Sequence, residues 1–312
     1  MIFTLTPNPS VDRSINVSQI RFNAVLRSRK IRLDWAGKGF NVSRSLQQFG
    51  IESIVLAWVG GGSGKMLADG LQHLGIQTDF VWVDEDTRTN TLIIEDQGDW
   101  HVKVNEPGPS ITPDAIDQMM LKVEGYAKKG DIWILSGSLP PDVPENFYAN
   151  LIRLLKSHGA SVYLDAGGVA LRLGCQEVPY LVKPNAIEAS KIVGFSIDDQ
   201  EDAKRATLPF LRMGIGYFAL TLGTSDLLIA SQREMVFATA PKVGVRNATG
   251  AGDSLLAGMI YAQTKGMDLI EVARWALATG AASIESEGVS EFDINRVQDL
   301  LPAVDSKIIN VL

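Results

Sequence analysis

A regular alternation of short apolar segments with segments of helical periodicity limits most strongly what this 312-residue chain can fold into. The apolar segments read as strands and span residues 2–6, 53–59, 131–135, 161–164, 180–183 and 217–222. Helices are predicted over residues 113–126, 144–158 and 199–213. Strands that are apolar throughout and alternate with helices are typical of a parallel sheet covered on both faces. We therefore expect an α/β fold whose ligands bind at the carboxyl ends of the strands.

Two regions break this alternation. Residues 11–33 and about 87–104 contain strands of alternating polarity and carry several arginines. Such strands favour a small, half-exposed sheet that could act as a lid over one end of the main domain. Because no internal repeat or low-complexity linker divides the chain, we expect residues 1–312 to form a single domain, with these two insertions as its lid.

The composition excludes several classes of partner. Lys and Arg number 29 against 36 Asp and Glu, so the net charge of −7 offers no broad basic surface for nucleic acid. Cys175 is the only cysteine, which excludes an internal disulfide and a multi-thiolate metal site. No apolar run reaches the length of about 18 residues that a membrane span requires, and the start of the chain lacks a signal-peptide pattern. We therefore expect a cytoplasmic protein that binds neither nucleic acid nor membrane.

Familiar nucleotide and nucleophile motifs do not fit the chain. A P-loop built around Gly64 and Lys65 would need glycine at position 59 and Ser or Thr at position 66. These positions are Val59 and Met66, so the motif does not fit. Residues 250–255 begin like a dinucleotide fingerprint but end in leucine, and no G-x-S-x-G elbow is present. The three histidines lie far apart in sequence, without the spacing of metal ligands.

One glycine-rich segment carries the strongest chemical signal. It reads Asn-Ala-Thr-Gly-Ala-Gly-Asp-Ser at residues 247–254 and leads into an apolar helix. The free backbone N–H groups and the dipole of such a helix start favour an anion, and small residues let a phosphate approach the backbone. Asp253 lies in the first turn, where its carboxylate either caps the helix or accepts a proton from an attacking hydroxyl. The residues alone leave both roles open.

This segment resembles the A-x-G-A-G-D signature of the PfkB/ribokinase-like carbohydrate kinases. Residues 36–44, Ala-Gly-Lys-Gly-Phe-Asn-Val-Ser-Arg, resemble a second signature of that family. Further similar segments occur in family order at residues 6–12, 136–141, 183–188 and 221–223. Three features are similar to the branch of the family that acts on phosphorylated hexoses: the Gly-Lys-Gly form of the second signature, residues 6–12, and residues 105–109.

The resemblance implies a ribokinase-like three-layer αβα domain with a mostly parallel central sheet and a small β-sheet lid. It also implies a kinase that uses ATP and Mg²⁺ to phosphorylate a primary hydroxyl of a hexose phosphate. Fructose 1-phosphate, converted to fructose 1,6-bisphosphate, is the first choice of substrate, and tagatose 6-phosphate and fructose 6-phosphate are alternatives. A sugar-phosphate sensor without catalytic activity is a further alternative. Because small half-buried sheets are stabilised by pairing, we expect a homodimer through the lid.

The resemblance also assigns roles to individual residues. Asp253 matches the catalytic base, and the backbone at Gly250, Ala251 and Gly252 matches the anion hole for the transferred phosphoryl group. The positions that match substrate-binding residues are Asp12, Arg27, Gly37, Lys38, Gly39, Asn41, Arg88 and Ser138. The positions that match nucleotide-binding residues are Lys183, Asn185, Thr221, Gly223 and Thr249. Asn185 and Glu188 match a motif that places Mg²⁺, largely through water.

Structural interpretations remain open for several of these positions, namely Asp12, Arg27, Ser138, Lys183, Asn185 and Glu188. Asn185 and Glu188 have the spacing of a capping box, and Asp12 could stabilise a turn. An exposed arginine is often only a solvated surface residue, and a lysine at a strand end often only extends its ammonium group to water. Asp226 stands where the family often has glycine, which leaves the nucleotide preference open.

Overall fold

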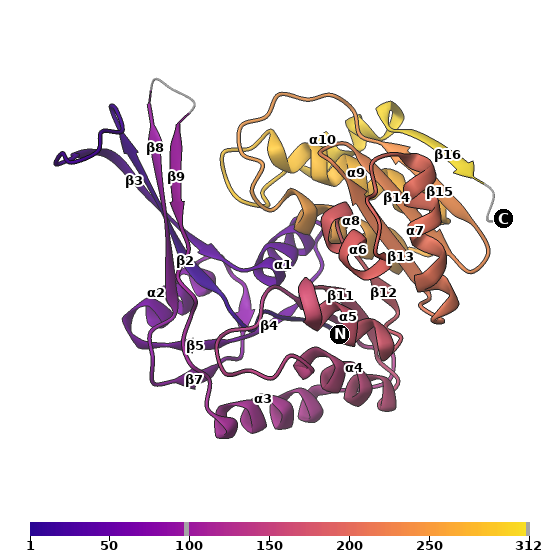
Figure 1. The fold of residues 1–312 in the computed structure, drawn as a ribbon, viewed down its shortest axis with the longest axis horizontal. Coiled ribbons are helices and arrows are strands. Elements are labelled where there is room, and N and C mark those ends of the chain that lie inside the picture. Colours follow the sequence, from indigo (N-terminus) through magenta and orange to yellow (C-terminus); the bar gives the residue numbers. More distant parts are fainter. Residues whose placement is uncertain (97–99, 310–312) are drawn as a thin grey trace.

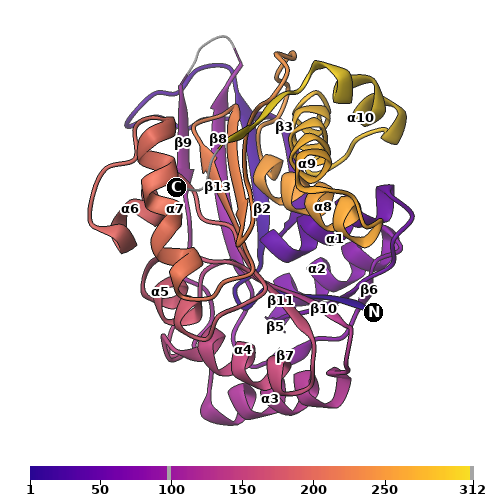
Figure 2. The same ribbon diagram turned by 90° about the vertical axis from the view of Figure 1, so that its right-hand side faces the viewer.

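A computed structural model describes residues 1–96 and 100–309 of the chain. Its centre is a ten-stranded sheet, seen from two sides in Figures 1 and 2. The strands, in their order across the sheet, are β16 (Asp305–Ile309), β15 (Met235–Thr239), β14 (Asp226–Ser231), β13 (Tyr217–Leu222), β12 (Leu181–Val182), β11 (Ser161–Asp165), β10 (Ile132–Ser136), β1 (Ile2–Leu5), β4 (Ile54–Leu56) and β6 (Gln77–Thr78). From β6 to β13 all neighbours are parallel, and from β13 to β16 they are antiparallel. The mostly parallel sheet expected from the sequence is confirmed.

Helices cover both faces of this sheet. One core cluster packs the first face against α3 (Pro113–Tyr126), α4 (Phe147–Ser157), α5 (Gly168–Gln176), α6 (Ala186–Val193) and α7 (Gln200–Arg212). A second cluster packs the other face against α1 (Lys38–Gln48), α8 (Ala251–Thr264), α9 (Leu269–Ile284) and α10 (Ile294–Leu300), which is followed by a short 3₁₀ helix (Leu301–Ala303). Within β10, Trp133 and Leu135 enter the first cluster while Ile134 enters the second, as the two-residue period of a strand requires. The three-layer αβα architecture is therefore confirmed.

Local sequence signals explain where individual elements begin. Thr112 caps α3 by accepting a hydrogen bond from the Ala115 amide, and Pro113 occupies the first helical position. Met119 and Val123 are fully buried on the inward face of this helix, as its periodicity predicts. The helix predicted from residue 144 begins three residues later, at Phe147.

One predicted strand is wrong in its extent. The apolar segment 53–59 forms two strands, β4 and β5 (Trp58–Gly60), and β5 leaves the central sheet to pair with β7 (Val81–Val83). Glycine then starts α2 (Gly61–His73), whose Leu67 and Leu71 are fully buried. No helix in residues 1–96 or 100–309 is long and apolar enough to cross a membrane.

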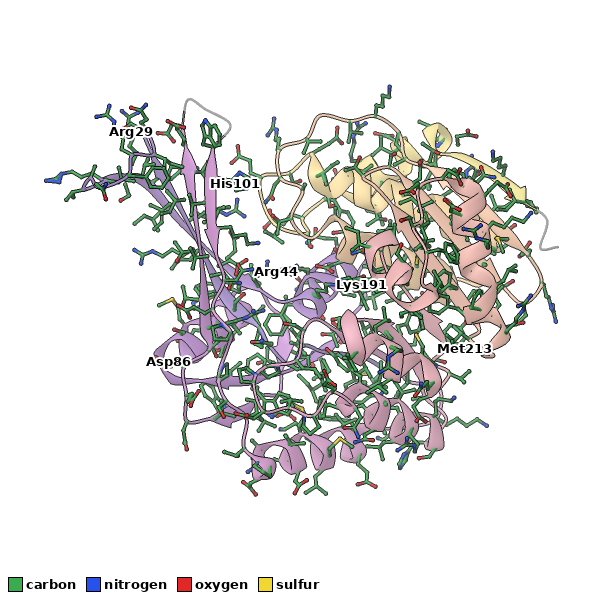
Figure 3. The ribbon with its side chains drawn as sticks, in the orientation of Figure 1. Arg29, Arg44, Asp86, His101, Lys191 and Met213 are labelled. Atoms are coloured by element: carbon green, nitrogen blue, oxygen red, sulfur yellow. The ribbon has the colours of Figure 1, made fainter. Side chains whose placement is uncertain are left out.

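A separate four-stranded sheet stands away from the body of the molecule (Figure 1). We call it the lid sheet; its order is β3 (Ser28–Ala36), β2 (Ser10–Val17), β8 (Arg88–Glu95) and β9 (His101–Val104). Both regions that break the sequence alternation contribute to it, although β3 extends beyond residue 33. Residues 97–99 of the second region lie outside the described residues. Figure 3 shows Arg29 and His101 at the outer end of this sheet and Arg44 near the body.

Candidate active site

The glycine-rich segment forms a tight turn that opens α8. Gly250 occupies the N-cap position with a φ of +81°, and a Cβ there would lie 2.6 Å from the Ser290 hydroxyl oxygen, so only glycine fits without strain. The amides of Asp253 and Ser254 donate to the Gly250 carbonyl at 3.0 and 2.8 Å. The Gly252 N–H has no acceptor among the described residues. The start of α8 therefore presents a free donor at the positive end of the helix dipole.

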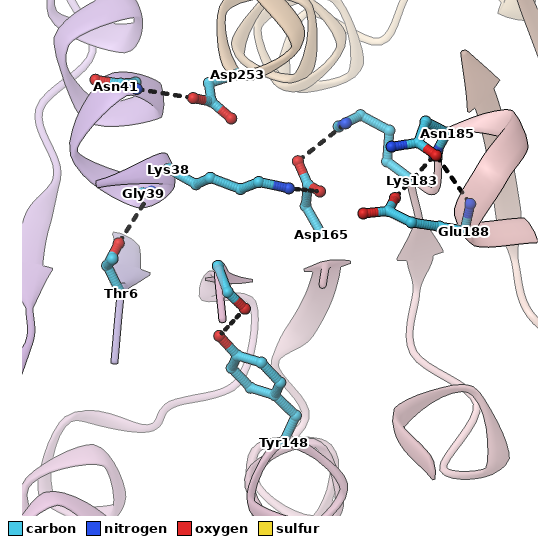
Figure 4. A network of polar contacts seen from close by, with 11 residues as sticks. Thr6, Lys38, Gly39, Asn41, Tyr148, Asp165, Lys183, Asn185, Glu188 and Asp253 are labelled. Carbon is cyan, nitrogen blue, oxygen red and sulfur yellow. Dashed lines mark hydrogen bonds and ion pairs between the residues drawn. The ribbon is translucent and has the colours of Figure 1, made fainter. Parts of the chain in front are cut away.

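Asp253 does not act as a cap for α8. Its buried carboxylate accepts a hydrogen bond from the side-chain amide of Asn41 at 2.8 Å (Figure 4). Burial, assisted by the nearby Asp165 carboxylate, raises the pKa of Asp253 to about 7, although Lys38 and Asn41 oppose the shift. A carboxylate with a pKa near neutrality can exchange a proton with a bound hydroxyl, so the geometry favours the role of base over the role of cap.

Two lysines meet on one buried carboxylate beside Asp253. Lys38, the first residue of α1, pairs with Asp165 at 2.8 Å, and Lys183, just after β12, pairs with the same residue at 2.9 Å. Burial alone would raise the pKa of Asp165, but the two ammonium groups hold it below its ordinary value. Asp165 in turn is the main cause that raises the pKa of Lys38. Asp165 and Lys38 are therefore charged at neutral pH.

The sequence interpretation missed Asp165. A usable signal was present, because a polar residue at the carboxyl end of a predicted strand, followed here by an alanine and two glycines, is the pattern that marks ligand sites in parallel sheets. Lys38 and Lys183 were both predicted as site residues, and the structure brings them together.

Three of the predicted nucleotide residues, Asn185, Thr221 and Gly223, lie together close after Lys183 and at the end of β13. Asn185 forms a β-bridge with Thr221, and Gly223 follows at the end of β13 with a φ of +59°. Asn185 and Glu188 form a complete capping box on α6, since each side chain accepts from the other residue's amide, at 2.9 and 3.0 Å. The structural interpretation of this pair is therefore confirmed, and a metal role would have to use the groups that the cap leaves free.

A mainly hydrated Mg²⁺ would fit those free groups. Glu188 uses one carboxylate oxygen in the cap, and its other oxygen has no hydrogen-bond partner among the described residues. No cluster of three His, Cys, Asp or Glu that could hold a metal occurs within residues 1–96 and 100–309. Mg²⁺ usually keeps several waters and binds through one or two carboxylates together with substrate phosphates. One open carboxylate oxygen suits that mode better than a protein cage.

A cleft of about 550 Å³ lies between the lid sheet and the loop that precedes α8. Of the predicted residues, Asp12, Asn41 and Thr249 line it. Asp12 lies within β2, paired on both sides, so it does not stabilise a turn. Ser10 and Asn90 donate to one of its carboxylate oxygens at 2.6 and 2.8 Å. Its other oxygen accepts no hydrogen bond from a described side chain.

The second signature forms the start of α1 beside this cleft. The Gly39 amide donates to the Thr6 hydroxyl at 2.9 Å, and a Cβ on Gly39 would lie 2.6 Å from that oxygen. Gly37 is the N-cap of the same helix, and a Cβ there would touch Thr6 and Phe40 at 3.0 to 3.1 Å. These glycines let the helix start approach β1 closely, which brings Lys38 and Asn41 to the site.

Six predicted substrate residues do not line the cleft, namely Arg27, Gly37, Lys38, Gly39, Arg88 and Ser138. Arg88 donates to the backbone carbonyls of Asn8, Pro9 and Glu106, at 2.8, 3.4 and 3.3 Å. Arg27 is exposed in the segment between β2 and β3. Ser138 is exposed in the loop after β10.

The cations that do line the cleft were not predicted, namely Lys30, Arg32, Arg44, Lys103 and Arg246. Lys30 and Arg32 alternate along β3 and therefore share one face, a period-of-two signal that the sequence contains. Arg32 pairs with Asp34 at 2.7 Å, and Arg44 is buried and donates to the Trp35 carbonyl at 2.8 Å. Lys30, Lys103 and Arg246 form no side-chain ion pair with any described residue. Cations without an ion-pair partner among the described residues thus line the cleft of an acidic protein, both on the lid sheet and on the loop before α8.

These features define a class of enzyme. A kinase that acts on a hydroxyl acceptor needs a base for the hydroxyl and groups that bind the transferred phosphoryl group. This three-layer α/β fold offers a buried carboxylate with a pKa near 7, a free amide at a glycine-rich helix start and a cleft with cationic walls. The sequence model described as pfkB family carbohydrate kinase matches residues 8–295, and the chain belongs to this family. It is a sugar kinase, a phosphotransferase.

Known relatives agree with this assignment. The chain is 32% identical over 306 residues to 1-phosphofructokinase of Bacillus subtilis, covering 97% of this chain and 98% of that protein. It is 31% identical over 288 residues to 1-phosphofructokinase of Rhodobacter capsulatus, covering 92% and 91%. A structure of Escherichia coli phosphofructokinase-2 with potassium superposes with a TM-score of 0.91 at 25% identity, covering 97% and 98%. A tetrameric inhibited form of that enzyme gives 0.89 at 25% identity, with the same coverage.

Proposed function

We propose that this kinase transfers the γ-phosphoryl group of ATP to a primary hydroxyl of a hexose phosphate, with fructose 1-phosphate as the preferred acceptor. The observation that carries the proposal is the buried Asp253 carboxylate, held by Asn41 beside the free amide of the α8 start. The names of the relatives support fructose 1-phosphate over the alternatives, fructose 6-phosphate and tagatose 6-phosphate.

In this mechanism the acceptor hydroxyl donates a hydrogen bond to Asp253, which takes its proton as the oxygen attacks the phosphoryl group. The free N–H of Gly252 stabilises the negative charge on the group in transfer, together with the N–H of Ala251, whose hydrogen bond to the Ala248 carbonyl is long at 3.4 Å. Lys38 and Lys183 add positive charge on either side of it. Mg²⁺, bound with ATP near Asn185 and Glu188, would neutralise charge on the nucleotide phosphates.

The acceptor's own phosphate needs a cationic partner, and we assign it to Arg88, with Ser138 and Arg27 as further contacts. Arg88 and Asn90 are two residues apart in β8, so their side chains leave the same face of the lid sheet, and Asn90 lines the cleft. Its register partner Ser10 lies two residues before Asp12 in β2. Two of its three carbonyl contacts, at 3.3 and 3.4 Å, are long. A phosphate would offer it shorter, charge-assisted hydrogen bonds. The remaining cations on the cleft walls would attract both anionic substrates.

We further propose that ATP binds along the ends of β12 and β13, near Lys183, Thr221 and Gly223, with Thr249 beside the phosphates. Asp226 opens β14 and accepts a hydrogen bond from Thr239 at 2.8 Å, so its carboxylate is already engaged. A cytoplasmic location belongs to the same proposal, because ATP and sugar phosphates are intracellular metabolites.

A homodimer through the lid sheet completes the proposal. The face of this sheet opposite the cleft carries a row of β-branched residues in register, Ile31, Ile15, Ile93 and Val102. Leu33 and Val104 are 41% and 57% exposed on the same face. An apolar sheet face left open to water is an energetic cost that a second copy would remove.

A substrate panel with coupled detection of ADP tests the proposed reaction. We expect the highest kcat/KM with fructose 1-phosphate, lower values with fructose 6-phosphate and tagatose 6-phosphate, and much lower values with unphosphorylated fructose. Binding of sugar phosphates without any ADP release would instead identify a sensor. A preference for unphosphorylated sugars would contradict the assignment of a hexose-phosphate acceptor.

A further inference from the structure

Among the residues that the structure describes, Asp165 alone forms an ion pair with both Lys38, on the sugar side, and Lys183, on the nucleotide side. It ends β11, is 1% exposed, and uses one carboxylate oxygen for Lys38 and the other for Lys183 (Figure 4). Lys38 lies 127 positions before it in the sequence, on the helix that also carries Asn41. Lys183 lies two residues before Asn185, on the nucleotide side. A single carboxylate thus joins the two halves of the site.

The two lysines differ in how far they are open to a ligand. The side chain of Lys183 is 7% exposed, whereas that of Lys38 is 39% exposed. Without Asp165, a buried ammonium group would face a second one with no counter-charge, and both would turn away from the site. With Asp165 in place, each ammonium group keeps one hydrogen-bonding direction fixed and others free for phosphate oxygens.

Resting on the proposed function above, we propose that Asp165 is a positioning residue: it holds the Lys38 and Lys183 ammonium groups beside Asp253, where they bracket the phosphoryl group in transfer. Asp165 itself does not touch the reacting atoms, since both of its oxygens are engaged by the lysines. Its effect on the rate passes through the two cations and through the charge that Asp253 experiences.

The charges around Asp253 make this role measurable. The groups that act on its carboxyl are Asp165, Lys38, Lys183 and the Asn41 amide. Asp165 raises the pKa of Asp253, whereas both lysines lower it. Asp253 must be deprotonated to accept a proton, so kcat/KM falls as the pH drops through this pKa. Removing the negative charge of Asp165 therefore shifts the acidic limb of the pH–rate profile to lower pH, and removing the positive charge of Lys38 shifts it to higher pH.

The experiment compares pH profiles of kcat/KM for the wild type, Asp165→Asn, Asp165→Glu and Lys38→Met, with fructose 1-phosphate and ATP. For Asp165→Asn we expect kcat to fall about 100-fold, a rise in KM for ATP, and an acidic limb about one pH unit lower. Asp165→Glu keeps the charge, so its limb stays near that of the wild type. Lys38→Met moves the limb in the opposite direction. These opposed shifts are not expected of a residue that only supports the fold.

Unchanged limbs in both Asp165→Asn and Lys38→Met, or wild-type rates in Asp165→Asn, would overturn the inference. If Asp165→Asn does not fold, Asp165→Glu decides, because it keeps the negative charge but moves the carboxylate: a positioning role predicts a lower kcat with an unchanged limb, and wild-type rates would overturn it. Asp253→Asn is run alongside. If Asp253→Asn loses activity but the acidic limbs of Asp165→Asn and Lys38→Met do not shift, the role of Asp165 is rejected while the kinase function stands. Full activity in Asp253→Asn would reject the proposed function itself.

Discussion

At the residue scale, the burial of Asp253 decides the chemistry. A carboxylate in the first turn of a helix would ordinarily satisfy a backbone amide, but this one faces Asn41 across the site instead. Replacing Asp253 by Asn removes the base while keeping its shape and the contact with the Asn41 side chain. We expect kcat to fall by about 10³-fold, with ATP binding retained. Coupled ADP release and calorimetric titration of ATP measure the two effects.

Asp84→Asn provides a matched control, because this exposed carboxylate lies outside the cleft lining. It should leave both measurements unchanged. A turnover rate of Asp253→Asn within a few-fold of the wild type would contradict the assignment of the base.

Arg88 is the second residue whose role the structure makes testable. Its guanidinium is held by carbonyl oxygens, and burial lowers its pKa although the nearby Asp12 and Glu106 oppose this. If it turns to the acceptor's phosphate, Arg88→Gln should lower kcat/KM for fructose 1-phosphate by about 10- to 100-fold. The small activity with unphosphorylated fructose should change much less. Equal losses with both acceptors would show that Arg88 supports the lid rather than the phosphate.

At the scale of elements, the capping box of α6 combines a structural and a proposed metal role in one pair. Glu188→Gln retains an oxygen that can accept from the Asn185 amide but removes the negative charge. Stability in urea should therefore change little, while the Mg²⁺ concentration for half-maximal activity rises. Asn185→Ala, in contrast, should destabilise the fold by about 1 kcal/mol. An unchanged Mg²⁺ requirement in Glu188→Gln would leave the pair with its capping role alone.

The elements also show how far the sequence alone could be interpreted. The central parallel strands were predictable because they are apolar throughout, and α3 because its cap and periodicity agree. The division of residues 53–59 into β4 and β5 was not, since the segment is apolar throughout and only tertiary pairing with β7 separates its halves. The antiparallel strands β14, β15 and β16 were also missed.

The site shows the same limit. Asp253 and the glycines were found because they are contiguous in sequence and match a family signature. The contact between Asn41 and Asp253 spans 212 positions, and that between Lys38 and Asp165 spans 127, so no local pattern reveals either one. Long-range charge pairing is a property of the folded sheet edge, which explains why the pairing of Asp165 with Lys38 and Lys183 emerged only from the structure.

At the scale of the whole molecule, the lid sheet has two chemically opposite faces. The face toward the body carries Asp12, Arg32 and Lys103, which line the cleft. The opposite face carries the apolar row that includes Ile31 and Val102. Because side chains alternate along a strand, each strand serves both faces at once. The proposed substrate site on one face and the proposed dimer contact on the other would therefore share the same four strands.

This arrangement predicts that self-association and activity depend on the outer face. Light scattering coupled to size exclusion should give twice the chain mass for the wild type at micromolar concentration. Ile31→Lys and Val102→Lys, at positions 48% and 40% exposed, should each shift the mass toward one chain and lower kcat/KM, because an unpaired lid is less well ordered. Leu121→Lys, at a position 66% exposed on α3, controls for the loss of an exposed apolar side chain. A monomeric wild type, or lid variants that remain dimeric, would contradict a dimer through this face.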